Sequence, residues 1–226
     1  MNIQQPIHDY YDELAPKYDQ DRFGNTYGQY IHQQESTILH HLLSYPAAMP
    51  TLDLGCGTGR LLPWATHGLD YSPAMIAEAK KKYPDHNLQV GSAWETPYEK
   101  ASFQAVYSFH VLMHLQTAEI PAVIHEARRI LKPGGRFIFD IPSKKRRTLL
   151  RYRSEHWHGA QSLSLEDILA ITSQDWKIQS YTGVLFLTIH RFPTWLRKPL
   201  RWIDDLLCQS IWRAYASYLV VELVRK

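Results

Sequence analysis

The segment from Leu52 to Gly59, with the sequence LDLGCGTG, constrains the fold of this chain more than any other segment. A short apolar run leads directly into three alternating glycines at positions 55, 57 and 59. Glycine tolerates positive φ angles and has no Cβ, so this spacing predicts a strand that ends in a tight turn whose backbone approaches a ligand closely.

Further strands and helices alternate along the chain. Besides the first strand at 49–54, the apolar runs predict strands at 87–90, 103–109, 136–141, 176–189 and 218–224. Helical patterns lie at 74–82, 117–131 and 194–209, a capping pair predicts a helix from Ser164, and 7–43 is expected to hold two or three short helices. This alternation predicts a helix-covered parallel sheet that binds ligands at the carboxyl ends of its strands.

Composition bounds the class of protein. With 226 residues and 45% hydrophobic content, one domain is expected, and a net charge of +3 does not by itself indicate a nucleic-acid partner. The polar N-terminus and the short apolar runs predict a soluble, cytoplasmic chain without a membrane span. Neither a disulfide nor a metal site is expected from Cys56, Cys208 and the histidines at 40, 41, 156 and 158.

A second motif follows the turn, where Asp70 precedes Ser72 and Pro73. Ser followed by Pro is a helix start, and the carboxylate at a strand end is placed to accept hydrogen bonds from ribose hydroxyls or to help cap the helix. A dinucleotide fingerprint needs a third glycine where Arg60 or Leu62 stands, which disfavours a nicotinamide-dependent oxidoreductase. The short interval between the turn and Asp70 predicts an abbreviated first helix and second strand.

These motifs, together with 90–98 (VGSAWETPY), 102–108 (SFQAVYS) and 126–135 (EARRILKPGG), resemble those of class I S-adenosylmethionine-dependent methyltransferases. The similarity runs from Tyr10 to about Ile141 and is greatest to the type 11 small-molecule group, related to the quinone-biosynthesis methyltransferases. The resemblance implies an α/β Rossmann-like, seven-stranded, mostly parallel sheet with helices on both faces, an antiparallel last strand and an N-terminal helical lid. It divides the single domain into a lid (1–44), a cofactor-binding core (45–142) and a substrate side (143–226).

The resemblance also implies S-adenosylmethionine as the cofactor and S-adenosylhomocysteine as the product. The implied cofactor-binding residues are Tyr11, Tyr18, Arg22, Asp53, Gly55, Cys56, Gly57, Thr58, Gly59, Asp70, Tyr71, Met75, Ser92, Ala93, Trp94 and Phe109. Two departures are visible, because Ser92 and Gln104 stand where family members usually carry an acid. A serine loses the charge-assisted hydrogen bond to adenine, so a modest cofactor affinity is expected.

Methyl transfer is an in-line displacement, so alignment and exclusion of water supply much of the catalysis and a general base is optional. His110, at the end of the fourth strand, is the first candidate base and His114 the second; for His114 a structural role is favoured. This strand end lacks the Asn/Asp-Pro-Pro-aromatic motif of enzymes that methylate base amines or amides. An oxygen, carbon or simple nitrogen acceptor is therefore expected.

Two features beyond the motifs bear on the acceptor. A basic cluster comprises Lys144, Lys145, Arg146, Arg147, Arg151 and Arg153, and an apolar stripe comprises Trp195, Leu196, Trp202, Ile203, Leu206 and Leu207, beside Arg197, Lys198 and Arg201. Both fit an anionic or lipid-like acceptor or a membrane surface, or equally a solvated turn and a helix packed on the sheet edge. A nucleoside-binding protein without turnover and an RNA-modifying methyltransferase stay as alternatives, and the oligomeric state is not predicted.

Overall fold

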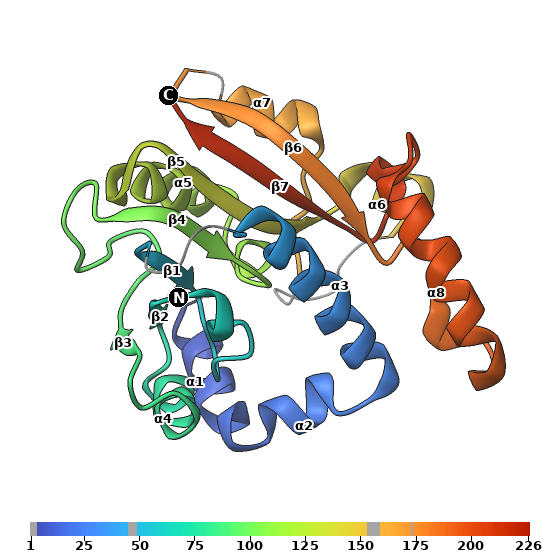
Figure 1. Cartoon of the computed structure of the whole chain (residues 1–226), viewed down its shortest axis with the longest axis horizontal. Helices are drawn as coiled ribbons and strands as arrows, with labels where there is room; N and C mark the ends of the chain where they lie inside the picture. Colours follow the sequence, from blue (N-terminus) through green and yellow to red (C-terminus); the bar gives the residue numbers. More distant parts are fainter. Residues whose placement is uncertain (1–3, 45–48, 153–158, 173) are drawn as a thin grey trace.

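A computed structural model of the chain describes residues 4–44, 49–152, 159–172 and 174–226. Its centre is a seven-stranded sheet in the order β3-β2-β1-β4-β5-β7-β6 (Figure 1). The strands are β1 Thr51–Leu54, β2 His67–Asp70, β3 Asn87–Val90, β4 Phe103–Ser108, β5 Leu131–Pro142, β6 Trp176–Val184 and β7 Tyr218–Arg225. The first five strands pair in parallel, and β7 runs antiparallel to both β5 and β6. The predicted Rossmann-like sheet with an antiparallel last strand is confirmed.

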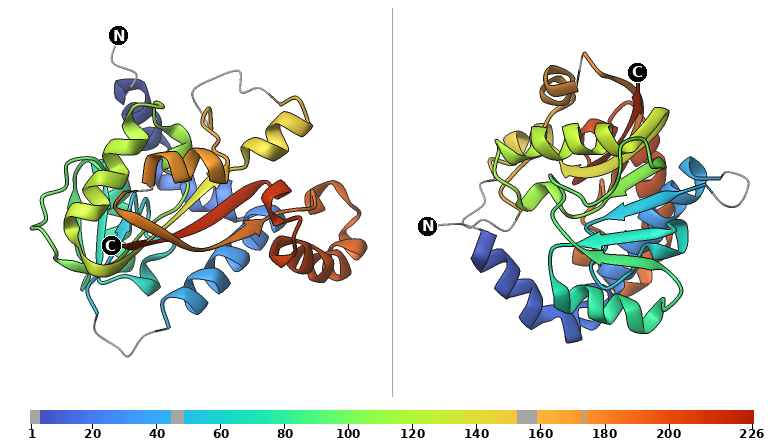
Figure 2. Two further views of the ribbon diagram at one scale, coloured as in Figure 1. Left: turned by 90° about the horizontal axis from the view of Figure 1, so that it is seen from above. Right: turned by 90° about the vertical axis from the view of Figure 1, so that its left-hand side faces the viewer.

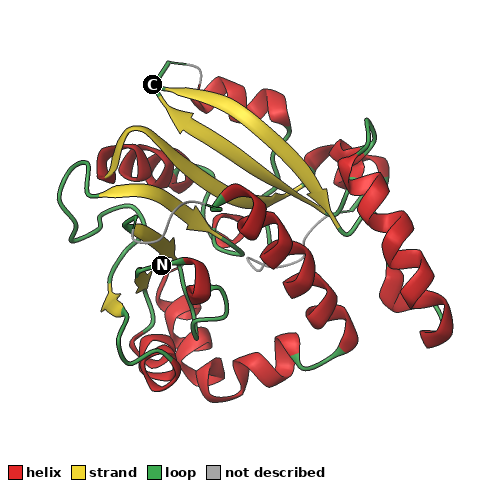
Figure 3. Cartoon of the chain, viewed as in Figure 1, coloured by secondary structure: helices red, strands yellow, loops and turns green. Residues whose placement is uncertain are grey.

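Helices cover both faces of this sheet, with α5 on one side and α3 on the other (Figures 2 and 3). The helices are α1 Gln4–Leu14, α2 Tyr18–Phe23, α3 Thr26–Leu42, α4 Pro73–Lys82, α5 Glu119–Ile130, α6 Lys144–Leu149, α7 Leu165–Thr172 and α8 Thr194–Gln209. Short 3₁₀ turns are η1 Ala15–Lys17, η2 Leu62–Trp64, η3 Leu112–His114, η4 Ile189–Arg191 and η5 Arg213–Tyr215. No helix in the described ranges is long and apolar enough to cross a membrane.

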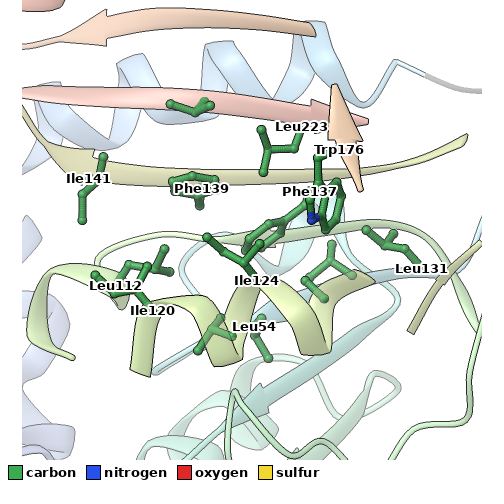
Figure 4. Packing of buried hydrophobic residues seen from close by; sticks show 14 of the residues in the cluster. Leu54, Leu112, Ile120, Ile124, Leu131, Phe137, Phe139, Ile141, Trp176 and Leu223 are labelled. Atoms are coloured by element: carbon green, nitrogen blue, oxygen red, sulfur yellow. The ribbon is translucent and has the colours of Figure 1, made fainter. Parts of the chain in front are cut away.

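The core lies on both faces of the sheet because successive strand residues point to opposite sides. In β5, Phe137 and Phe139 pack with α5 on one face, whereas Ile138 packs with α3 on the other. Figure 4 shows the first of these layers, in which Ile120 and Ile124 of α5 lie against the phenylalanines. Two apolar layers thus fix the central strands, and with them the strand ends that carry the polar residues described below.

Local signals set most boundaries. Ser72 accepts a hydrogen bond from the Met75 N–H (3.0 Å) and begins α4, as predicted. Ser164 and Asp167 exchange side-chain to backbone hydrogen bonds at the start of α7, which confirms the capping pair. The predicted abbreviation after the glycine turn is also observed, because only the 3₁₀ turn η2 separates β1 from β2.

Some predicted bounds were wrong. β6 ends at Val184 and not at 189, because Leu185 adopts a φ of +55° and the chain turns there. β5 begins at Leu131, five residues before the predicted start, because Leu131 already pairs with Phe103 of β4 and an irregularity separates this pair from the next one, Arg136 with Ala105. The N-terminal segment forms three helices as expected, but α3 is long, with 17 residues.

Candidate active site

The glycine turn joins β1 to η2 with positive φ at Gly55 (+85°), Gly57 (+52°) and Gly59 (+89°). A Cβ on Gly55 would lie 2.2 Å from Val111 Cγ2, so that position admits no side chain. A Cβ on Gly57 would have no other atom within 4 Å, so there is open space beside the backbone at this position. The turn therefore combines a tightly packed first glycine with an accessible second one, as close approach of a ligand requires.

Asp70 lies at the carboxyl end of β2 and faces the turn. Its Oδ2 accepts a hydrogen bond from the Gly57 N–H (2.8 Å) and its Oδ1 accepts one from the Ser72 N–H (2.9 Å). Burial raises the pKa of this carboxyl, although the two backbone donors oppose the shift. Asp70 thus helps to hold the start of α4 and also borders the cavity, so both predicted roles are sterically compatible.

Asp53 in β1 supplies a second carboxyl, which is 2% exposed. Burial raises the pKa of Asp53 to about 8, against the opposing charge of Arg60. Asp53 therefore keeps its proton near neutral pH and gives the cavity wall a neutral hydrogen-bonding group.

These groups border one cavity at the carboxyl ends of β1, β2 and β4. Its lining residues are Tyr11, Tyr18, Asp53, Gly55, Cys56, Gly57, Thr58, Arg60, Leu61, Leu69, Asp70, Tyr71, Met75, Gly91, Ala93, Trp94, Phe109, His110, Val111, His114, Leu115 and Glu119. Tyr11 and Tyr18 come from the N-terminal helices, so a segment distant in sequence completes the wall. The aromatic rings of Tyr71 and Trp94 lie 6.4 Å apart on the opposite side.

A charged cluster closes the inner end of this cavity. His110 Nε2 lies 2.7 Å from Glu35 Oε1, and His110 Nδ1 lies 3.4 Å from Asp140 Oδ2. Glu35 Oε2 in turn lies 2.7 Å from Arg60 Nη2. His110 has an unusual φ of +59°, and its N–H donates to Asp140 Oδ1 (2.6 Å), which holds this strained backbone in place.

Electrostatics fix the charge of His110. Burial disfavours the imidazolium, but the carboxylates of Glu35 and Asp140 outweigh burial and raise the pKa of His110. Burial raises the pKa of Asp140 to about 6, against the charge of His110. Both ring nitrogens face acids, which favours the charged imidazolium form of the ring. The role of general base that the sequence predicted for His110 stays a prediction. Carboxylates and a histidine also match a metal-ligand set, but the Arg60 guanidinium already supplies a cation there.

His114 lies beside Tyr11 on the cavity wall. The Gly159 N–H donates to His114 Nδ1 (3.0 Å), which places the proton of the neutral ring on Nε2. That nitrogen lies 3.1 Å from the Tyr11 hydroxyl oxygen and donates to it. In this arrangement His114 is a hydrogen-bond donor toward Tyr11, and accepting a proton at Nε2 would require loss of the Gly159 contact.

Comparison with known proteins identifies the family. Residues 52–139 match a family described as a methyltransferase domain. This segment is a methyltransferase domain, and the relatives that the chain resembles include proteins named as S-adenosylmethionine-dependent methyltransferases. It is 26% identical over 205 residues to a 2-phytyl-1,4-naphtoquinone methyltransferase of Thermosynechococcus vestitus, covering 81% of this chain and 82% of that protein.

Other relatives agree over shorter lengths. A probable S-adenosylmethionine-dependent methyltransferase of Mycolicibacterium smegmatis is 29% identical over 121 residues, and the match covers 51% of this chain and 46% of that relative. The chain thus spans about half the length of that relative. Among solved structures, a magnesium protoporphyrin IX methyltransferase of Synechocystis with bound S-adenosylhomocysteine has a TM-score of 0.69 at 18% identity, covering 99% of this chain and all of that one. That likeness shows the fold.

The cavity of this methyltransferase includes all but three of the residues predicted for the cofactor. Arg22 is exposed on α2 and donates to the Tyr10 hydroxyl (2.7 Å), and it is not among the lining residues. Ser92 accepts a hydrogen bond from the Trp94 N–H (3.3 Å) within its own loop. Gly59 borders a second, shallower hollow between α2 and α4. These three positions lie outside the wall because each serves its local turn or helix.

Sequence reasoning missed the charged cluster. Glu35 was one acid among many in a helical segment, and Arg60 was considered only as the residue that breaks a dinucleotide motif. Asp140 carried a usable signal, because a carboxyl at the end of an apolar central strand lies where such sheets bind ligands. The remaining missed lining residues are Leu61, Leu69, Gly91, Val111, Leu115 and Glu119.

The predicted basic cluster is largely neutralised. Lys144 pairs with Asp167 (2.9 Å) and Lys145 with Glu166 (3.0 Å), both acids of α7. Arg146 donates to two backbone carbonyls. These contacts favour a folded, paired turn over an anion-binding patch; Arg153, His156 and His158 lie outside the described residues.

Proposed function

We propose that this methyltransferase transfers a methyl group to an oxygen of a small-molecule acceptor that enters already deprotonated, such as a carboxylate or phenolate. One observation carries this choice of acceptor. Both histidines at the cavity have each ring nitrogen engaged, His110 by two acids and His114 by Gly159 and Tyr11. Neither ring is available as a base, so the acceptor oxygen must already be deprotonated when it enters the cavity.

The cavity fits the cofactor of the family. The accessible backbone at Gly57 and the carboxylate of Asp70 match a ribose, and the rings of Tyr71 and Trp94 give aromatic surface for a purine. The carboxyl of Asp53, which holds its proton up to a pH of about 8, adds a neutral hydrogen-bonding group to the cavity wall. We assign these residues to cofactor binding, with Tyr11 and Tyr18 closing the site from the N-terminal helices.

When bound, S-adenosylmethionine would supply an electrophilic methyl group, with the sulfur of S-adenosylhomocysteine as the leaving group. The protein aligns the acceptor oxygen with the carbon–sulfur bond and excludes water. The Tyr11 hydroxyl and the His114 ring to which it is bonded lie where an anionic oxygen can be held by hydrogen bonding. The imidazolium of His110 adds positive charge at the inner end, which the flanking acids keep in place.

Carbon and simple nitrogen acceptors were also expected from the sequence. Transfer to carbon leaves a proton to be removed from the acceptor, and an ammonium group must lose a proton before its nitrogen can attack. The paired histidines offer no site for either proton. Relatives named for quinone precursors and neighbours named for geranyl diphosphate and protoporphyrin methylation support a small organic acceptor. The cytoplasmic location stays a prediction.

Calorimetry with S-adenosylmethionine and S-adenosylhomocysteine tests the cofactor site. We expect both to bind, and Asp70→Asn to weaken binding at least about tenfold, since a charge-assisted hydrogen bond is worth about 1.5 to 3 kcal/mol. Mass spectrometry of products from aromatic acids, phenols, amines and quinols then identifies the acceptor. Binding without transfer to any acceptor, including RNA, would identify a nucleoside-binding protein.

The pH dependence of kcat tests the acceptor class. If the acceptor enters as an anion, the midpoint of the pH profile of kcat follows the pKa of the acceptor. It should therefore move to higher pH when a carboxylic acid is replaced by a phenol. A midpoint that stays constant across acceptors and is lost in His114→Asn would instead show a histidine base and overturn the proposal.

A further inference from the structure

Helix α8 presents its polar side to the protein. Asp204 is fully buried, and its Oδ2 accepts hydrogen bonds from the Tyr30 hydroxyl (2.9 Å) and the Gln34 amide (3.0 Å) of α3. Cys208, one turn further, is also buried. A surface helix ordinarily buries its apolar stripe, so this orientation is the reverse of the usual one.

The apolar residues of α8 face outward instead. Trp195, Trp202 and Leu206 are 75%, 68% and 51% exposed, and their spacing of seven and four residues places them on one side of the helix. Directly after the helix, Ile211 and Trp212 are 87% and 57% exposed. We call these five residues the α8 face. The sequence left open whether the apolar stripe packs on the sheet edge, and the structure shows that its main residues do not.

Basic residues outnumber acids around this face, although Arg201 and Arg213 lie over the rings of Tyr30 and Tyr181. From Ile189 to Arg213 the basic residues are Arg191, Arg197, Lys198, Arg201 and Arg213. The acids in the same stretch are Asp204, which is buried, and Asp205, which bonds to Tyr30 and Gln34. Arg191 and Lys198 are exposed. A patch of tryptophans and aliphatic residues with basic neighbours is typical of helices that lie in a membrane interface.

We propose that the α8 face binds the surface of a lipid bilayer that contains anionic lipids. Helix α8 runs along one side of the molecule (Figures 1 and 2). Its exposed apolar side chains form a ridge, and such a ridge enters a fluid interface without needing a matching groove. Its positive surroundings repel a second copy of the same face but attract anionic headgroups. Charge complementarity therefore favours the bilayer over self-association.

The position of α8 relates this surface to the cavity. β6 ends at Val184 opposite Tyr218, the first residue of β7, and Tyr218 also pairs with Pro142 at the end of β5. Residues 185–217, including α8, thus lie at the sheet edge where the parallel strands end and the cavity opens. This inference goes beyond the proposed methyl transfer and does not depend on it.

Vesicle flotation with the full chain tests the proposal. We expect binding to phosphatidylcholine vesicles that contain phosphatidylglycerol, weaker binding to pure phosphatidylcholine, and loss of binding as salt is raised. The double substitution Trp202→Ser and Leu206→Ser should reduce partitioning at least about tenfold, because it removes two apolar side chains from the interface. Lys198→Glu should reduce binding to the anionic vesicles only.

Leu169→Ser on α7 is the matched control, because Leu169 is 49% exposed, close to the 51% of Leu206, but lies outside the α8 face. It should leave partitioning unchanged, and all variants should keep the thermal unfolding midpoint and cofactor binding of the parent. Absence of binding at low salt, or an equal loss in Leu169→Ser, would overturn the proposal. A dimer in sedimentation equilibrium that the double variant dissociates, without vesicle binding, would assign the face to a second copy instead.

Discussion

Replacing Glu35 by glutamine tests whether the charged cluster stabilises the fold. Glu35 is 1% exposed, and its two carboxylate oxygens contact His110 Nε2 and Arg60 Nη2, each at 2.7 Å. Glutamine keeps the size and shape of the side chain but removes its charge. The substitution leaves two part-buried cations, Arg60 and His110, without their shared anion.

The magnitude follows from the pKa of Glu35. Burial favours the neutral acid, but the charges of Arg60 and His110 prevail and lower the pKa from the ordinary 4.5 to about 2. This difference corresponds to about 3 kcal/mol of stability. Removing one partner of a buried ion pair costs about 3 to 5 kcal/mol in other proteins, which agrees. We expect Glu35→Gln to lower the free energy of unfolding at pH 7 by about 3 kcal/mol.

The pH dependence has a definite sign. Because the pKa in the folded chain lies below that in the unfolded chain, the contribution of Glu35 is complete above the unfolded value of about 4.5. It is lost as the pH falls from there toward 2. Urea unfolding followed by tryptophan fluorescence should therefore show parent and variant far apart at pH 7 and closer together at pH 3. In the variant, the pKa of His110 measured by NMR should also fall, because Glu35 helps to raise it.

The chain offers a sharp control. The pKa of Glu166 is also lowered to about 2, through a backbone N–H and Lys145, but the Glu166 side chain is 67% exposed. Solvent and salt screen such a pair, so Glu166→Gln should not measurably change stability. An equal loss in the two variants, or a loss below about 1 kcal/mol for Glu35→Gln, would refute the reasoning that burial makes the cluster stabilising.

Four further measurements test the site. Tyr11→Phe removes the hydroxyl bonded to His114 and should lower kcat about tenfold with an unchanged cofactor Kd, measured by product formation and calorimetry. Gly57→Ala forces alanine to a φ of +52° beside the open space and should weaken cofactor binding at least about tenfold in calorimetry. Ser72→Ala removes the cap of α4 and should cost about 1 kcal/mol in urea unfolding. Asp53 holds its proton up to a pH of about 8 in the folded chain, so its contribution makes stability fall as the pH rises from 4 to 8, and Asp53→Asn should flatten that slope.

Local chemistry made much of the site predictable. The positive φ of Gly57, the end of β2 at Asp70 and the cap by Ser72 depend on neighbouring residues, so residue types and spacing sufficed. The strands of the core were found for the same reason, because their apolar runs are short and bounded by turn residues. Their ends differed by a few residues where turns and pairing with a neighbouring strand extended or shortened them.

The missed features depend on contacts between distant segments. Glu35 meets His110 only because α3 packs across the end of β4, and no local pattern encodes that contact. For helix α8, the sequence predicted the apolar stripe but not the orientation of the helix. Its periodicity predicts an apolar stripe correctly, but periodicity does not say which side faces the protein. The buried contact of Asp204 with Tyr30 settles the orientation, and it joins residues 174 positions apart.

The short crossover after the glycine turn gives Arg60 a structural role that a full helix would not require. With only η2 after the turn, no long helix packs behind it, and the N-terminal helices hold it instead. Arg60 bonds to Glu35 of α3 and stacks on Phe23 of α2 with 4.2 Å from its guanidinium carbon to the ring centre. Thr58 in the turn donates to Asp19 of α2 (2.5 Å). Since these same helices contribute cavity-lining tyrosines, release of the N-terminal helices would loosen the turn as well as open the cavity, so ordering of the helices and cofactor binding should be thermodynamically linked.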